Sequence, residues 1–145
     1  MVAIASSNRL LSVVADLLLA DASLSAPPLS SRVYRSVAPV TATYPVLILD
    51  GVSGIDLNTA NGIHVLQNST FQVTVRGKGG TSTATLQTIM EDAAAVLVAV
   101  VRYTASGIYV ARIRRIREIP RPPDVENNVV YPQLLSEFYC EVSVA

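Results

Sequence analysis

Hydrophobic side chains recur along the chain with two periods, and the change of period separates predicted helices from predicted strands. Residues 8–20 and 81–103 carry apolar side chains three and four positions apart, each after residues that can cap a helix, so both segments are predicted helices. Phe71–Val75 and residues 134–144 alternate apolar and polar side chains, which is typical of strands with one face in water. These four segments form the predicted framework of the domain.

Three further segments are predicted to be extended. Val46–Leu49 is a short, continuous apolar run, which is typical of a strand buried on both faces. Ile108–Ile119 reads as a strand whose apolar phase slips between Ile113 and Ile116, which indicates a β-bulge or bend. Arg32–Tyr44 carries β-branched and aromatic residues interrupted by a proline, so it is predicted to be an edge strand or an extended arm.

The remaining segments are predicted to be turns and loops. Residues 21–31 contain a Pro-Pro pair and are expected to form a surface connection, while residues 103–107 are expected to form a turn. Residues 51–62 hold three glycines and two asparagines, so a loop or hairpin tip is predicted there. Its large apolar residues Ile55 and Leu57 are candidates for contact with another chain.

The order of these elements predicts an α+β fold: one domain over residues 1–145, with a mostly antiparallel β-sheet and one long and one short helix packed on one face. The long helix has an apolar surface much wider than a single stripe. A helix of that kind needs a second packing partner besides the sheet.

Composition narrows the functional classes. Half of the residues are hydrophobic and 15% are charged, which excludes an intrinsically disordered chain. Eleven basic residues balance eleven acidic ones, and a formal net charge of zero favours association with other chains over long-range attraction to nucleic acid or membranes. No apolar run is long enough to span a membrane, and Asp16 interrupts residues 10–20, which favours a helix there over a secretion signal.

The sequence holds few groups from which a catalytic site could be built. A single cysteine and a single histidine exclude disulfide frameworks and Cys/His metal clusters. Cys140 alternates with core residues of a predicted strand, so a packed thiol is favoured over a nucleophile paired with His64. Residues 77–82 lack the spacing of a phosphate-binding loop, and the adjacent Glu91 and Asp92 point apart on a helix. Neither an enzyme nor a cofactor is expected.

The sharpest local feature is a cluster of arginines in the predicted strand near the C-terminus. Its members are Arg112, Arg114, Arg115, Arg117 and Arg121. One interpretation places these side chains against DNA phosphates or an acidic partner. The favoured interpretation pairs them with acidic residues of the last segment, within the chain or across a subunit boundary, because opposite charges on neighbouring strands commonly pair.

Several passages, taken in order, resemble one known family. These are Arg32–Tyr34 with Ala38-Pro39 and Tyr44–Leu47, then Phe71–Val75 before the alanine-rich helix, and finally Arg121–Asp124, Tyr131 and Tyr139–Val142. Their order and spacing are similar to those of the tail terminator, or tail completion, proteins of long-tailed bacteriophages and related gene-transfer particles. One departure is Arg76, which stands where that family usually has an aromatic residue.

The resemblance implies a structural virion protein without catalytic activity. It implies a hexameric ring at the tail-neck junction, which caps the tail tube protein and receives the head connector, with non-specific contact to passing DNA as a further option. Another neck or head-completion connector protein is the main alternative, because such proteins share size and composition. A small non-catalytic binding module is the alternative from a different class.

Overall fold

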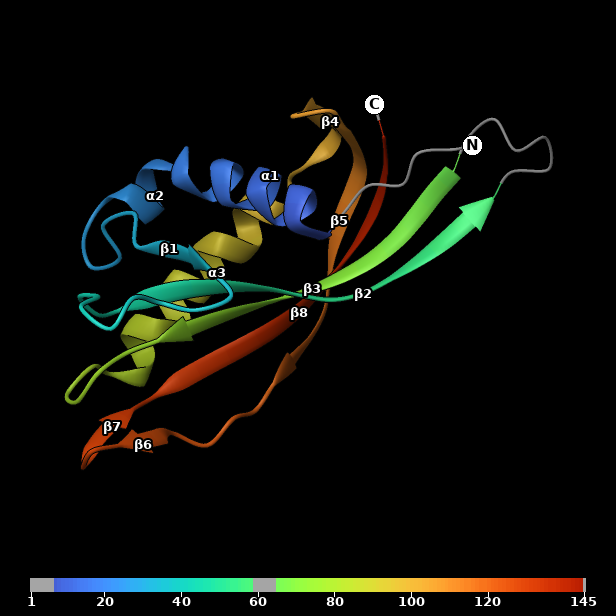
Figure 1. Cartoon of the computed structure of the whole chain (residues 1–145). Helices are drawn as coiled ribbons and strands as arrows, with labels where there is room; N and C mark the ends of the chain where they lie inside the picture. The colour runs from blue at the N-terminus through green and yellow to red at the C-terminus, as the bar shows by residue number, and fades with distance from the viewer. Residues whose placement is uncertain (1–6, 59–64, 145) are drawn as a thin grey trace.

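The computed structural model describes residues 7–58 and 65–144 of the 145-residue chain (Figure 1). The helices are α1 (Ser7–Leu19), α2 (Ala22–Ser25) and α3 (Thr83–Val98). The strands are β1 (Val33–Arg35), β2 (Val46–Asn58), β3 (Val65–Arg76), β4 (Val101–Ala105), β5 (Ile108–Ile119), β6 (Asp124–Glu126), β7 (Val129–Tyr131) and β8 (Gln133–Val144).

Six of these strands form one curled sheet in the order β1-β2-β3-β8-β5-β4, and β6 pairs with β7 in a separate hairpin. The short edge strand β1 runs parallel to β2, and every other pairing described is antiparallel. Helices α1 and α3 lie on the same face of the sheet (Figure 1). The predicted α+β class with a mostly antiparallel sheet is therefore confirmed.

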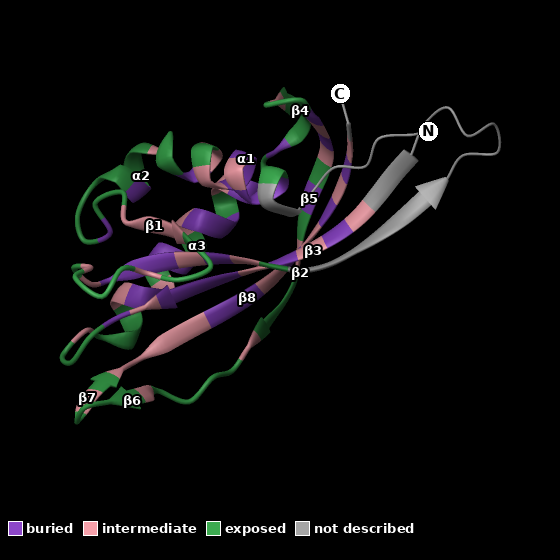
Figure 2. Ribbon diagram, in the orientation of Figure 1, coloured by how far each residue is buried: buried purple, intermediate pink, exposed green. Residues whose placement is uncertain are grey.

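The core lies between that face of the sheet and the two helices, where buried residues concentrate (Figure 2). At its centre the rings of Phe71 and Phe138 stack across paired strands, with centroids 5.5 Å apart. Helix α3 buries Leu86, Met90 and Leu97 and packs against α1 as well as against β3, β5 and β8. Helix α1 is thus an internal partner for the wide apolar surface of the long helix.

The structure differs from expectation between residues 99 and 107. Helix α3 ends at Val98, and Val101–Ala105 form the edge strand β4 where the end of the helix and a turn were predicted. Ser106 and Gly107, with φ of 52° and 76°, make the actual turn between β4 and β5. Two successive residues of positive φ match the twist of a tight hairpin, and β-branched Val101 with aromatic Tyr103 suits a strand.

A loop or hairpin tip was predicted at residues 51–62, and the segment belongs to a hairpin that is strand as far as the structure describes it. Strand β2 continues to Asn58 and pairs with β3 up to Val65, so Gly51–Asn58 is one arm of a long hairpin. Ile55 and Leu57 belong to this arm, whereas residues 59–64, with His64, lie outside the described residues. The predicted surface connection at residues 21–31 contains the short helix α2, whose first turn Asp21 caps through its side chain.

The C-terminal half contains one predicted feature and one unpredicted feature. Strand β5 carries register shifts against β8 after Val110 and after Arg115, which confirms a bulge where the apolar phase slips. The β6–β7 hairpin was not predicted, and its turn is formed by Asn127 and Asn128, with φ of 51° and 64°. Asparagine adopts this conformation more readily than other residues with side chains.

Candidate interaction surfaces

The two register shifts in β5 divide the arginine cluster between the two faces of the sheet. Directly opposed residues of an antiparallel pair share a face. Arg112, Arg114 and Arg117 oppose Glu141, Tyr139 and Glu137 of β8, on the face that the helices leave open. Arg115 opposes the buried Phe138 and therefore lies on the helix-covered face. The predicted cluster is thus not a single basic patch.

The open face carries cross-strand pairs within one chain. Arg112 Nη2 lies 3.4 Å from Glu141 Oε1, and Arg117 Nη2 lies 3.3 Å from Glu137 Oε2. The Arg117 side chain is 64% exposed and that of Glu137 13%, so the carboxylate lies beneath the guanidinium. Pairs of this exposure contribute between zero and about 1 kcal/mol each. They neutralise most of the charge that the cluster would offer to a partner.

The same face also carries Tyr139, which contacts Arg114 through its ring and Asn68 through its hydroxyl. The Arg114 guanidinium lies 5.1 Å from the centre of the Tyr139 ring, and the Tyr139 hydroxyl donates a hydrogen bond to the side-chain oxygen of Asn68. No ion pair of Arg114 is found among the described residues. Arg114 is accordingly the cation of this face with the least internal compensation.

Arg115 joins strand β5 to its neighbours on the covered face. Its Nη2 lies 2.8 Å from Glu118 Oε1 and donates to Ser136 Oγ at 2.8 Å. Glu118 also accepts a hydrogen bond from Gln87 of α3 at 3.4 Å. These contacts connect β5, β8 and α3, so the role of Arg115 in this chain is structural.

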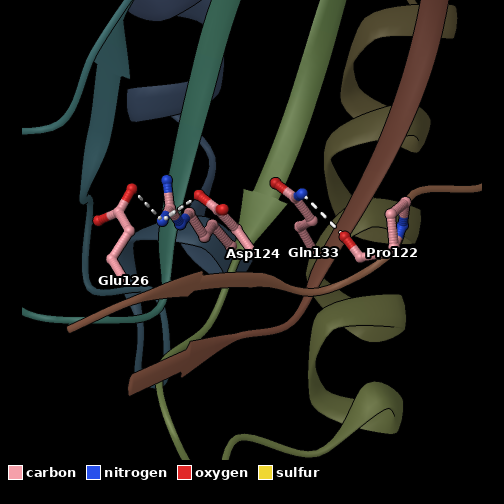
Figure 3. A network of polar contacts seen from close by, with 5 residues as sticks. Pro122, Asp124, Glu126 and Gln133 are labelled. Carbon is pink, nitrogen blue, oxygen red and sulfur yellow. Dashed lines mark hydrogen bonds and ion pairs between the residues drawn. The ribbon is translucent and has the colours of Figure 1, made fainter. Parts of the chain in front are cut away.

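A second arginine site, where β3 ends beside the start of β8, was missed in the sequence. Arg76 ends β3, its side chain is 18% exposed, and its Nη2 lies 3.0 Å from Asp124 Oδ2 and 3.4 Å from Glu126 Oε1. Figure 3 shows both carboxylates directed at this guanidinium. The guanidinium also lies 4.4 Å from the centre of the Tyr131 ring. Two acidic groups and an aromatic ring of the β6–β7 hairpin therefore hold one cation.

Backbone contacts fasten the same hairpin to the turn after β3. Gly77 and Gly79 donate their N–H groups to the carbonyls of Pro132 and Val130, each at 2.8 Å. Gln133 donates to the carbonyl of Pro122 at 3.1 Å, closing the base of the hairpin (Figure 3). Two features of the sequence could have indicated this site. Arg76 stands at the end of a predicted strand where the resembling family usually has an aromatic residue, and the charged residues after Arg121 are all acidic.

Beside this network lies an open hollow of about 490 Å³ between the β1–β2 connection and the β6–β7 hairpin. Its lining combines apolar side chains with polar ones, among them the charged groups of Arg76, Lys78 and Glu126. Val37 and Val40, which also line it, are 74% exposed and fully exposed respectively. The hollow therefore offers apolar surface to another molecule and has no constellation suited to catalysis among its lining residues.

The single thiol is buried in the core. Burial, and to a smaller degree the charge of Glu141, raises the pKa of Cys140 from 9.0 to about 12. A thiol with that pKa is protonated at neutral pH and is a poor nucleophile. Among the described residues, no group of three or more His, Cys, Asp or Glu side chains could hold a metal ion. None of the helices in the described ranges has the length and apolar character needed to cross a membrane.

Comparison with known proteins adds a structural likeness. No family model matches the sequence, and no curated protein matches it. The fold is similar to that of a chain in the structure of the virion of a native gene transfer agent particle, with a TM-score of 0.64 and 16% sequence identity. The similarity covers 90% of this chain and 91% of that chain. The two chains therefore share a fold over nearly their whole lengths.

Proposed function

We propose that this protein is a structural component of a phage-like virion and acts as a tail terminator. In this proposal, identical copies form a closed ring that caps the tail tube and receives the head connector. The observation that carries it is the likeness to a virion chain across nearly the full length of both. The resemblance of its strand-forming passages to the tail terminator family supports the finer assignment.

The surface chemistry supports a role in assembly. The arginines of β5 are compensated largely within the chain, and the residues that line the hollow do not form a reactive constellation. Exposed valines lie at three separate places: on the β1–β2 connection, on the β6–β7 hairpin, and where α3 ends and β4 begins. Exposed apolar residues gathered in this way mark sites of contact with other proteins.

The proposal is tested by locating the protein on separated parts of particles. Particles from a producing strain are dissociated into free heads and free tails, and an antibody against this protein is imaged on each by electron microscopy. A tail terminator labels one end of free tails. Label on the portal vertex of free heads would instead support the head-completion alternative, and absence of label from both would contradict a virion role.

A further inference from the structure

Two of the apolar patches that remain exposed after the core has formed lie at opposite edges of the six-stranded sheet. The α3–β4 patch consists of Val98, Ala99, Val101 and Tyr103. The loop patch consists of Val37, Pro39 and Val40, which line the hollow. Because β1 and β4 are the two ends of the strand order, the patches belong to different sides of the molecule.

The α3–β4 patch is not used by the packing inside the chain. Helix α3 already buries its inner stripe against α1 and the sheet, yet Val98 remains 47% exposed. Val101, in the next element, is 64% exposed, and β4 pairs only with β5. An edge strand with exposed apolar side chains is a ready site for a second chain.

Exposed charges of opposite sign lie beside the two patches. Arg102 is the one charged residue between residues 93 and 110 and is exposed, while Asp21 and Asp92 line an open hollow on the other side of Ala99. The hairpin that forms the far wall of the hollow carries Asp124 and Glu126, which share the Arg76 guanidinium, and the chain has no lysine or arginine after Arg121. Besides Arg76, Lys78 also lines the hollow, and it is exposed in the turn between β3 and α3.

We infer that the α3–β4 patch of one copy packs on the loop patch of the next copy, with Arg102 toward the acidic hairpin of its neighbour. The two patches are different surfaces of one chain, so the contact is head-to-tail and repeats from copy to copy. A head-to-tail contact closes into a ring when its rotation divides a full turn. This inference rests on the proposed function and names the surfaces through which such a ring would form.

The test uses two introduced cysteines and a short bismaleimide, which joins neighbouring thiols without requiring that the sulfur atoms meet. The full chain carrying Val40→Cys and Val101→Cys is treated with the reagent and separated under denaturing conditions. A head-to-tail contact gives a ladder of covalent multimers. Each single-cysteine variant gives at most a trace of dimer, because one thiol per chain cannot extend a ladder.

Two controls define the outcome. The wild-type chain stays monomeric on the gel, because Cys140 is buried and protonated. An Ile116→Cys, Val101→Cys chain is the matched control, since Ile116 is an exposed apolar residue of β5 that belongs to neither patch and does not line the hollow. A ladder equally strong in this control, or none in the first variant, overturns the inference.

The inference and the proposed function can fail separately. A ladder from a protein that is absent from particles would retain the contact and remove the virion role. A protein found at the tail end without a ladder in the Val40→Cys, Val101→Cys chain would retain the role and remove this contact.

Discussion

At the residue scale, Cys140 links the packing of the core to pH. The folded protein holds the thiol proton more tightly than the unfolded chain does, because burial raises the pKa of Cys140 from 9.0 to about 12. The resulting stability is fully present below pH 9 and is lost as pH rises through this window. We expect the free energy of unfolding to fall by about 1.4 kcal/mol per pH unit there.

Urea denaturation at about pH 8 and about pH 10.5 measures this loss, which should reach about 2 kcal/mol. Other groups titrate in the same range, so Cys140→Ala is the reference. This variant is less stable at the lower pH, because a buried side chain is shortened, but its stability should fall less steeply. Equal slopes for the two proteins would show that the thiol is not protected by the core.

Arg76 is the residue on which the β6–β7 hairpin depends. Replacing Arg76 with Gln leaves Asp124 and Glu126 without their shared cation and removes the contact with Tyr131. Both carboxylates are partly exposed, so we expect a loss of about 1–2 kcal/mol together with release of the hairpin. Cleavage by a glutamate-specific protease after Glu126 should become faster than in the wild-type chain.

Arg117→Gln is the control for this variant, because Arg117 forms an ion pair but is 64% exposed. Its stability and its cleavage rate after Glu126 should stay close to those of the wild type. If the two variants behaved alike, the hairpin would be held by the backbone bonds of Gly77 and Gly79 alone.

At the element scale, the turn between β4 and β5 sets the edge of the sheet. Gly107 adopts a φ of +76°, a conformation that costs a residue with a side chain about 1 kcal/mol. Gly107→Ala should therefore lower the free energy of unfolding by about that amount. Gly80→Ala is the matched control, since no atom lies within 4 Å of an added Cβ and its φ is not in the positive region. The unfolding temperatures of both variants are measured. A lower value for Gly107→Ala alone indicates backbone strain at Gly107, whereas equal changes in both indicate a general effect of replacing glycine.

The arginines of β5 give a second prediction for an element. Their ion pairs on the open face lie within one chain, so we expect an Arg112→Ala, Arg114→Ala variant to assemble like the wild type at low and moderate salt. Light scattering at both salt concentrations measures assembly. A variant that loses assembly would show that these side chains also reach a neighbouring chain, and an intact assembly with altered DNA release would indicate contact with DNA.

The helices and strands differ in how well they can be predicted from the sequence alone. Helix α1 and strands β3 and β8 could be predicted, because each repeats one period over a long run and buries one face. Strand β4 and the β6–β7 hairpin could not, because they are short, largely exposed and held by turn geometry or by distant partners. Arg76 is the clearest case, since its partners lie 48 residues away or more.

The arginine cluster is visible in the sequence, but the division of its side chains between two faces of the sheet depends on bulges. One extra residue in a strand moves every later side chain to the other face. The sequence indicated one phase slip, and the structure contains two register shifts, after Val110 and after Arg115. The faces of Arg112 and Arg115 therefore followed only from the observed pairing with β8.

At the scale of the whole molecule, a chain of zero net charge with apolar patches at opposite edges is suited to head-to-tail association with copies of itself. The β2–β3 hairpin extends beyond the helix-covered body, which gives each copy an arm as well as two edges (Figure 1). Whether Ile55 and Leu57 in that arm contact another chain stays a prediction. The test introduces a cysteine at each of these two positions and compares the rate of labelling by a thiol reagent in free protein and in particles. Contact with another chain should make labelling slower in particles.

We propose that copies of this chain form a closed ring at the end of a virion tail. A cryo-electron microscopy reconstruction of the head-tail junction, from particles that carry this protein, tests the claim most directly. We expect one ring of density at the tail end, into which identical copies of this fold dock edge to edge. A junction in which no density fits this fold, or in which it fits only isolated copies, would contradict the claim.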